Sequence, residues 1–211
     1  MMEQELLRIF NEKREPMGTA PREEIHRQGY WHETFHCWFA KEEKGKIFLY
    51  FQLRSANKKD YPDMLDITAA GHLLADESVS DGTREVEEEI GIKLMFSELK
   101  LLDIIDYSVT AGELRDNEIA HVFLYPFHGT SSDFVLQKEE VSGIYRTELA
   151  AFKELIEGIR KDIVIDGFEE DSGDNRCVKQ MTAGMERFVP HEDSYYKRVL
   201  ELIEQKMAGV L

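Results

Sequence analysis

The sequence has little cysteine and no long apolar run. Only Cys37 and Cys177 occur among 211 residues, too few and too far apart for a disulfide framework or a zinc knuckle. No stretch approaches the ~20 apolar residues of a membrane span. The acidic N-terminus lacks the basic start and apolar core of a secretory signal. We therefore expect a reducing, cytoplasmic location.

Basic residues are also scarce. The chain carries 26 Lys and Arg against 42 Asp and Glu, which gives a formal net charge of −16. We expect no nucleic-acid partner and no membrane partner, because duplex DNA and anionic membranes both attract basic surfaces. An anionic substrate would need local neutralisation in such a protein, and a divalent metal is the simplest candidate.

Apolar residues are present in sufficient number to form a core. They make up 42% of the chain, and aromatic residues make up 10%, a composition that excludes general disorder. The length fits one domain with an appended segment. We expect one domain over residues 1–160 and a C-terminal extension, residues 161–211, packed on the same domain.

The apolar pattern predicts a mixed α/β chain with mostly antiparallel strands. Residues 31–40 alternate, so that Phe35, Cys37 and Phe39 share one face, and this strand forms a hairpin with a second strand over 46–53. Residues 1–30 fit a loose lead-in or an edge hairpin, and residues 159–190 look irregular. The other predicted elements are strands near 99–109, 118–127 and 143–146 and helices over 78–90, 149–158 and 194–207.

The acidic helix carries three carboxylates on one face. Glu85, Glu88 and Glu89 stand at positions i, i+3 and i+4, while Val86 and Ile90 mark the face that docks on the sheet. Clustered carboxylates supply hard oxygen ligands for Mg²⁺ or Mn²⁺, and such an ion lowers the pKa of a bound water. The same run also fits a solvated helix face. The spacing alone leaves both interpretations open.

The segment around this helix resembles the Nudix box, Gly-x5-Glu-x7-Arg-Glu-U-x-Glu-Glu-x-Gly-U, in which U is aliphatic. The fixed positions are supplied by Gly71, Glu77, Arg84, Glu85, Val86, Glu88, Glu89, Gly91 and Ile92. There is one departure, because six residues instead of seven separate Glu77 from Arg84. Either Glu77 or Asp76 therefore fills the outer acidic position.

The resemblance implies a Nudix fold of the α/β (α+β) class, with a mixed central sheet sandwiched between helices and a C-terminal helical extension. It also implies a hydrolase that cleaves a diphosphate linked to another moiety and requires Mg²⁺ or Mn²⁺. The implied metal ligands are Glu85, Glu88, Glu89 and the carbonyl of Gly71. Arg84 would orient Glu85, and Glu85 or a more distant acid would activate the attacking water.

The neighbouring segments resemble the isopentenyl-diphosphate isomerase-like branch of the superfamily. The resemblance covers roughly residues 10–160 and rests on 31–38, 53–62 and 70–72. In isomerases a catalytic cysteine directly precedes the Gly-His pair, whereas Ala70 stands there in this chain. Isomerases also lose most of the helix glutamates that this chain keeps. Both differences favour a hydrolase over an isomerase.

Further candidate residues come from the same branch. Asp116 and Glu118 share one strand face and resemble the Glu-x-Glu that completes the isomerase metal site, so Glu118 is a candidate catalytic acid; solvated acids at a strand entry would look the same. His26, His32 and His72 are similar to the histidine ligands of that site, although histidines in strands are often simply packed.

The resemblance also implies substrate-binding positions. Arg54 and Lys58 correspond to phosphate-binding positions in this branch, and His72 is a third candidate; cations suit a diphosphate, although surface charge would give the same pattern. The expected partner is a small-molecule diphosphate. The amphipathic C-terminal helix allows a homodimer. Three alternatives stay open: an isomerase-like enzyme, a non-catalytic sensor of a diphosphate ligand, and a scaffold in which the C-terminal helix is the working part.

Overall fold

The computed structural model describes residues 5–111, 114–171, 173 and 175–209, so that the first four residues of the acidic N-terminus lie outside the described residues. The described strands form one sheet, whose main path runs β11-β10-β9-β4-β3-β1-β2. The strands are β1 (Leu6–Phe10), β2 (Pro16–Pro21), β3 (Trp31–Glu43), β4 (Lys46–Arg54), β5 (Leu65–Ile67), β6 (Ala69–His72), β7 (Lys100–Ala111), β8 (Leu114–Pro126), β9 (Val141–Glu148), β10 (Ile163–Glu170) and β11 (Arg176–Ala183). The helices are α1 (Arg22–Gln28), α2 (Thr83–Ile90), α3 (Leu149–Ile156) and α4 (Asp193–Met207).

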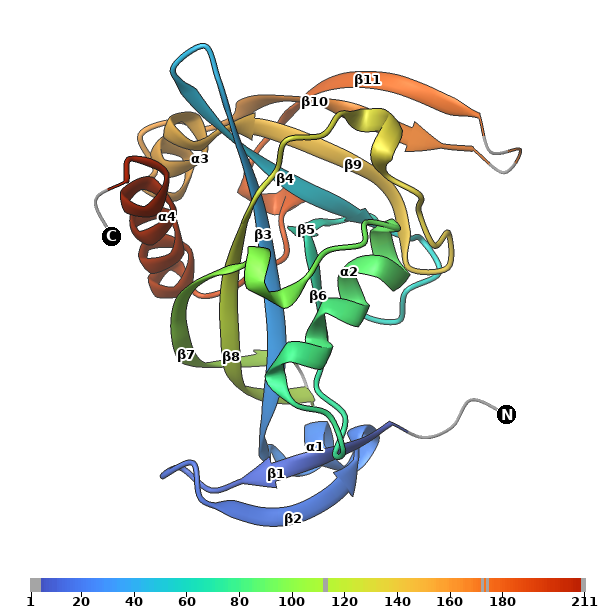
Figure 1. The fold of residues 1–211 in the computed structure, drawn as a ribbon, viewed down its shortest axis with the longest axis vertical. Helices are drawn as coiled ribbons and strands as arrows, with labels where there is room; N and C mark the ends of the chain where they lie inside the picture. The colour runs from blue at the N-terminus through green and yellow to red at the C-terminus, as the bar shows by residue number, and fades with distance from the viewer. Residues whose placement is uncertain (1–4, 112–113, 172, 174, 210–211) are drawn as a thin grey trace.

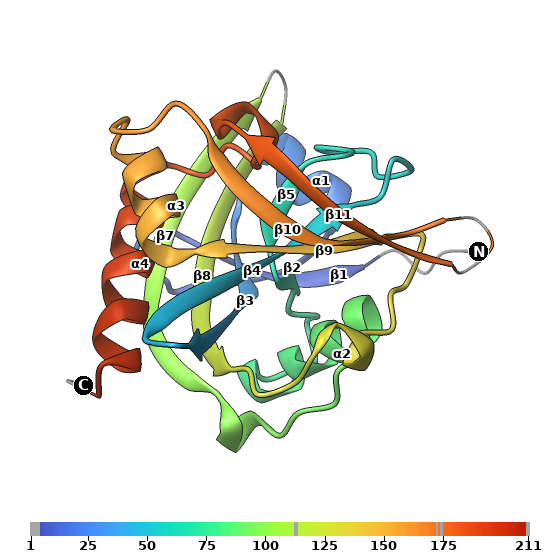
Figure 2. The ribbon, with the colours of Figure 1, turned by 90° about the horizontal axis from the view of Figure 1, so that it is seen from above.

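Helices cover both faces of the central strands (Figures 1 and 2), with α3 and α4 on one side and α2 on the other. The alternation in β3 explains this arrangement. Trp38 and Ala40 pack in an apolar cluster with side chains of α3 and α4. Phe35, Cys37 and Phe39 pack in a second cluster with side chains of α2. The predicted alternation is confirmed, and both faces of the strand are buried.

The strand β3 lies at the centre of the sheet and sets the register of the site. It forms the predicted hairpin with β4, and it also pairs antiparallel with β6 and parallel with β8. His32 lies opposite Glu118 of β8, and Thr34 lies opposite His72 of β6. Because side chains alternate along a strand, these four point to the same face of the sheet.

One prediction of secondary structure is wrong, and another is confirmed only in part. Residues 159–190, predicted to be irregular, contain the antiparallel hairpin β10–β11, whose first strand pairs with β9. The helix predicted to begin at residue 78 begins instead as a 3₁₀ turn, Val79–Gly82, and the α-helix starts at Thr83. For residues 1–30 the hairpin alternative is confirmed in the described part, since β1 and β2 pair before α1.

The last helix belongs to the same core. The apolar stripe of α4 is buried against the sheet and α3, through Tyr195, Val199, Leu202 and Ile203. This stripe is therefore used within the chain, and it gives no support to a homodimer. None of the described helices is both long and apolar enough to cross a bilayer.

Candidate active site

One pocket of about 280 Å³ is lined by most of the predicted site residues. Its walls come from α2, from β3, β6 and β8, from the loop after β4, and from the segment before α4. The predicted residues that line it are Arg54, Lys58, Gly71, His72, Arg84, Glu85, Glu88, Glu89 and Glu118.

The glutamates of α2 differ in burial. Glu89 is buried, and its Oε2 accepts hydrogen bonds from Gln52 Nε2 at 3.1 Å and from the backbone N–H of Ala70 at 3.2 Å. Glu85 is half-buried and Glu88 is exposed. Burial raises the pKa of Glu85 to about 7 and, together with the charge of Glu85, raises the pKa of Glu89 to about 8. A divalent cation would stabilise these buried carboxylates in their ionised form.

Gly71 allows β6 and α2 to approach closely. A Cβ atom built at Gly71 would overlap the carboxylate of Glu85, so a residue with a side chain would push this carboxylate away from β6. The strand and the helix thus form a small cradle around the carboxylate of Glu85. Glu85, Glu88 and Glu89 are not among the groups of described residues whose ligand atoms all lie within 4.8 Å of one another. Hard oxygen ligands of this kind fit Mg²⁺ or Mn²⁺.

Arg84 ties the acidic residues of the box together. Its Nε and Nη2 donate to the carboxylate of Glu77 at 2.8 and 3.1 Å, and its Nη1 donates to Glu88 at 2.8 Å. Its Nη2 also lies 3.0 Å from Oε1 of Glu85. Glu77, and not Asp76, therefore occupies the outer acidic position, and the 3₁₀ turn accommodates the shortened spacing.

A group of three histidines lies beside the cradle. His26 of α1, His32 of β3 and His72 of β6 have ring centroids 5.1 to 5.5 Å apart. Each Nε2 atom is buried and has no hydrogen-bond partner among the described residues. His32 Nδ1 lies 3.1 Å from the carbonyl of Tyr30. Because a carbonyl only accepts, Nδ1 carries the proton and Nε2 offers a lone pair.

Two carboxylates complete this second group. Oδ1 of Asp116 lies 3.4 Å from Nε2 of both His26 and His32, and it also lacks a hydrogen-bond partner in the part of the chain that the structure describes. Burial and the charge of Glu118 raise the pKa of Asp116 to about 8, and burial lowers the pKa of His26 to about 4. The ligand atoms of His32, Asp116 and Glu118 lie within 4.8 Å of one another. Neutral imidazoles beside a carboxylate oxygen without a hydrogen-bond partner, Oδ1 of Asp116, fit a bound metal ion.

The two cations predicted to bind phosphate are held by the protein itself. Arg54 donates to Oδ2 of Asp66 at 2.9 Å, and it donates through Nε and Nη2 to the carbonyl of Asp60 at 3.2 and 2.9 Å. Lys58 is paired with Glu140. The guanidinium has five N–H groups and these contacts use three, so the remaining groups suit an anion.

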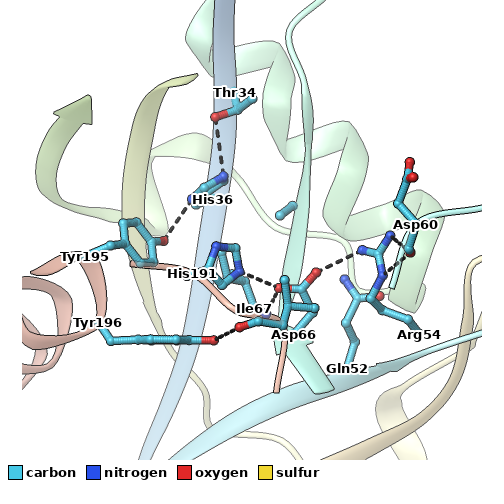
Figure 3. A network of polar contacts seen from close by, with 12 residues as sticks. Thr34, His36, Gln52, Arg54, Asp60, Asp66, Ile67, His191, Tyr195 and Tyr196 are labelled. Carbon is cyan, nitrogen blue, oxygen red and sulfur yellow. Dashed lines mark hydrogen bonds and ion pairs between the residues drawn. The ribbon is translucent and has the colours of Figure 1, made fainter. Parts of the chain in front are cut away.

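Sequence reasoning missed the polar residues behind the pocket (Figure 3). Asp66 lies between Arg54 and His191, whose Nε2 is 2.9 Å from Oδ1 of Asp66. Burial would raise the pKa of Asp66, but the hydrogen bond and charge of His191 and the charge of Arg54 outweigh it and hold this pKa below its usual value. No local motif joins residues that are 125 positions apart. The predicted strand face of His36 could have drawn attention to that residue, whose Nε2 is 3.1 Å from Glu118.

The chain was compared with known proteins, and no protein-family profile matches it. It is 36% identical over 202 residues to an uncharacterized Nudix hydrolase of Clostridium acetobutylicum. The match covers 96% of this chain and 98% of that protein. It is 36% identical over 149 residues to Nudix hydrolase 3 of Arabidopsis thaliana (68% of this chain, 19% of that protein). It is 27% identical over 121 residues to an isopentenyl-diphosphate Delta-isomerase of Mycolicibacterium vanbaalenii (56% of this chain, 65% of that protein). The crystal structure of DR0079 from Deinococcus radiodurans has a TM-score of 0.54 and 18% identity, over 74% of this chain and 88% of that one.

The structure has a mixed sheet between helices, and the helix α2, which carries the carboxylates, packs against Gly71 of β6. This arrangement is that of a Nudix fold. The chain belongs to the Nudix hydrolase family, as its identity with the clostridial relative along nearly the whole of both chains shows. The resemblance and the fold class inferred from the sequence are thereby confirmed. The chain spans about a fifth of the Arabidopsis relative and just under two thirds of the isomerase.

Proposed function

We propose that this protein hydrolyses a diphosphate bond in a small molecule that carries a diphosphate linked to another moiety, with Mg²⁺ or Mn²⁺ as cofactor. The observation that carries the proposal is the meeting of the carboxylates of α2 and β8 with the cations Arg54 and Lys58 in one pocket. A volume of about 280 Å³ lies near the lower end of the range for ligand pockets, so it favours a compact substrate.

The residues present divide into two ligand sets. Glu85, Glu88, Glu89 and the carbonyl of Gly71 would hold one metal ion. A second ion would be held by His26, His32, His72, Asp116 and Glu118. His72 thereby moves from the predicted substrate-binding role to the second ligand set. A bound divalent ion supplies positive charge to the phosphate oxygens and lowers the pKa of a water ligand.

The protein supplies the base and the binding groups. Arg84 holds Oε1 of Glu85, so that Oε2 is the oxygen placed to accept the proton of the attacking water. Glu118 is the second candidate acid in the pocket. Arg54 and Lys58 orient the diphosphate and offset its negative charge.

The test is release of phosphate or nucleotide from a broad panel of diphosphates with Mg²⁺ or Mn²⁺. Wild type is compared with the double variant Glu88→Gln/Glu89→Gln and with Glu87→Gln, a control on the exposed side of the same helix. We expect turnover that collapses in the double variant and persists in the control. Turnover that survives the double variant would refute the role of α2, and binding without turnover would indicate a sensor.

A second candidate function is isomerisation of an isoprenoid diphosphate, favoured by the histidine cluster beside Glu118. Ala70 lines the pocket at the position of the isomerase cysteine and has no proton to donate. Isopentenyl diphosphate incubated with the protein in D₂O distinguishes the two reactions, since isomerisation incorporates deuterium at carbon and hydrolysis does not. We expect no incorporation.

A further inference from the structure

Two side chains of the C-terminal segment, His191 and Tyr195, take part in a network of polar contacts next to the pocket (Figure 3). His191 lies in the loop before α4, and Tyr195 lies in the first turn of that helix. The side chain of His191 is 8% exposed and Tyr195 is 1% exposed. Each begins a series of hydrogen bonds that ends at a residue of the proposed active site, Glu118 in one case and Arg54 in the other.

The hydroxyl of Tyr195 fixes the position of a proton on His36. The indole N–H of Trp38, which can only donate, points to this hydroxyl at 3.2 Å. His36 Nδ1 lies 2.8 Å from the same oxygen. These are its two hydrogen-bond partners among the described residues, so the buried hydroxyl hydrogen is satisfied only by donation to Nδ1. The proton of the neutral imidazole then sits on Nε2.

The Nε2–H group of His36 in turn orients Glu118. It lies 3.1 Å from Oε2 of Glu118 and 3.3 Å from Oγ1 of Thr34. The hydroxyl of Thr34 donates to the same Oε2 at 2.9 Å. His36 thus holds the Thr34 hydroxyl that donates to Glu118 and lies against the same carboxylate oxygen. A carboxylate held this way can present its other oxygen to a ligand in a constant direction.

His191 makes the second connection. Its Nε2 lies 2.9 Å from Oδ1 of Asp66, which also accepts the backbone N–H of Ile67 at 2.8 Å. Oδ2 of Asp66 then holds Nη1 of Arg54 at 2.9 Å. His191 therefore helps to fix the carboxylate on which the guanidinium rests.

We infer that His191 and Tyr195 are positioning residues of the active site. Tyr195 sets the tautomer of His36 and thereby the orientation of Glu118, whereas His191 sets the orientation of Arg54 through Asp66. The effect on catalysis rests on the function proposed above; the tautomer of His36 does not. The C-terminal segment is on this account part of the catalytic apparatus, and we expect the loss of either contact to leave the fold in place.

Steady-state kinetics of Tyr195→Phe and His191→Phe test the division of roles. We expect Tyr195→Phe to lower kcat about tenfold with little change in KM, because an acid of the pocket loses its orientation. We expect His191→Phe to raise KM about tenfold with a smaller change in kcat, because a binding group is displaced. The matched control is Tyr196→Phe, whose hydroxyl donates to the carbonyl of Val189 at 2.8 Å and belongs to neither series.

Substitutions of His36 separate positioning from simple packing. The amide of His36→Gln can place an N–H near the position of Nε2, whereas the shorter His36→Asn cannot reach Glu118. We expect the Gln variant to retain several-fold more kcat than the Asn variant at equal thermal stability. Equal kcat in both variants would overturn the positioning role of His36.

The tautomer is read without any substrate. Long-range ¹H–¹⁵N correlation spectra of histidine-labelled protein at pH 8 should show His36 protonated at Nε2 in wild type and in Tyr196→Phe, and a mixed state in Tyr195→Phe. A wild-type proton on Nδ1 would overturn the inference. If no diphosphate is turned over while the tautomer is as expected, the proposed reaction fails and the structural inference stands. If wild type is active and Tyr195→Phe matches Tyr196→Phe, the inference fails alone.

Discussion

The side chain of Gly71 is a single hydrogen atom, and this leaves the space that the carboxylate of Glu85 occupies. Arg84 holds the same carboxylate from the other side, at 3.0 Å from Oε1. The position of the Glu85 carboxylate is therefore set by the missing side chain at Gly71 and by the ion pair with Arg84. Each of these can be changed separately.

Gly71→Ala should displace the Glu85 carboxylate, because the new methyl group overlaps it. We expect Mn²⁺ affinity and kcat to fall by about tenfold or more, since misplacement of a reacting group by ~1 Å can cost up to ~100-fold. Calorimetric titration with Mn²⁺ measures the affinity, and circular dichroism shows that the variant is folded. An unchanged Mn²⁺ affinity would contradict the proposed ligand set.

Arg84→Lys keeps the charge but loses the planar fork that reaches Glu77 and Glu88 together. We expect metal affinity or kcat/KM to fall roughly 10–100-fold, the range found when groups that orient metal ligands are removed. Arg160→Lys is the control, because Arg160 lies at the surface, away from the pocket, and its side chain pairs with Glu154. Equal losses in the two variants would show a general effect of arginine replacement.

Residues of the Nudix box could be predicted from the sequence because they are local: a helix and the strand before it carry the whole pattern. The proximity of His32 and Asp116 was suggested only by the resemblance to the isomerase site and not by local spacing, because their contact depends on the parallel pairing of β3 with β8. Asp66, His191 and Tyr195 gave no signal at all. Their roles arise from hydrogen bonds between segments more than a hundred residues apart.

At the scale of elements, α2 combines an apolar face that packs on β3 and β6 with buried acids that destabilise the metal-free protein. The pKa of Glu89 rises from 4.5 to about 8 and that of Glu85 to about 7 on folding, mainly through burial. The folded state therefore binds these protons more tightly than the unfolded state. The resulting stability is fully present below about pH 4.5 and is lost as the pH rises to about 8.

Glu89→Gln should consequently stabilise the metal-free protein at pH 8 by roughly 1–3 kcal/mol, with the difference disappearing near pH 4.5. Urea unfolding in the presence of a chelator at several pH values measures this. Glu87→Gln, at an exposed position of α2, should change stability by less than about 0.5 kcal/mol at every pH. A destabilised Glu89→Gln at pH 8 would show that the carboxylate is stabilised by the protein alone.

The hairpin β10–β11 shows why an element can escape a reading of the sequence. β11 is exposed along nearly its whole length, and Val178 is 88% exposed. A strand at the edge of a sheet needs no apolar alternation, so its sequence resembles a loop. Gly167 in β10 also makes the sequence look like a loop. In the structure, the missing side chain at Gly167 lets β10 approach the carbonyl of Ile144 closely.

At the scale of the whole molecule, the side chains of α4 pack in the same hydrophobic cluster as those of the sheet and α3. The buried side chains of α4 are Tyr195, Tyr196, Val199, Leu200, Leu202 and Ile203. Burial of each contributes about 1.5–3 kcal/mol, and the sum of about 9–18 kcal/mol is comparable to the 5–15 kcal/mol by which a typical domain is stable.

Deletion of residues 190–211 should therefore leave an unfolded or insoluble chain. The scaffold alternative predicts instead that a chain lacking 160–211 still hydrolyses its substrate. Circular dichroism and the soluble fraction of the shortened protein decide between the two. A folded, active chain without α4 would show that the remaining residues are sufficient for folding and activity.

The dependence of the pocket on His191 and Tyr195 has a consequence for biosynthesis. The candidate metal ligands all lie between His26 and Glu118, so a ribosome makes them within the first ~60% of the described chain. The residues that orient Glu118 and Arg54 are made many seconds later at ~5–20 residues per second. A nascent chain can thus carry every candidate ligand before His191 and Tyr195 exist to hold Glu118 and Arg54 in position, so the proposed site is complete only after residue 195 has been made.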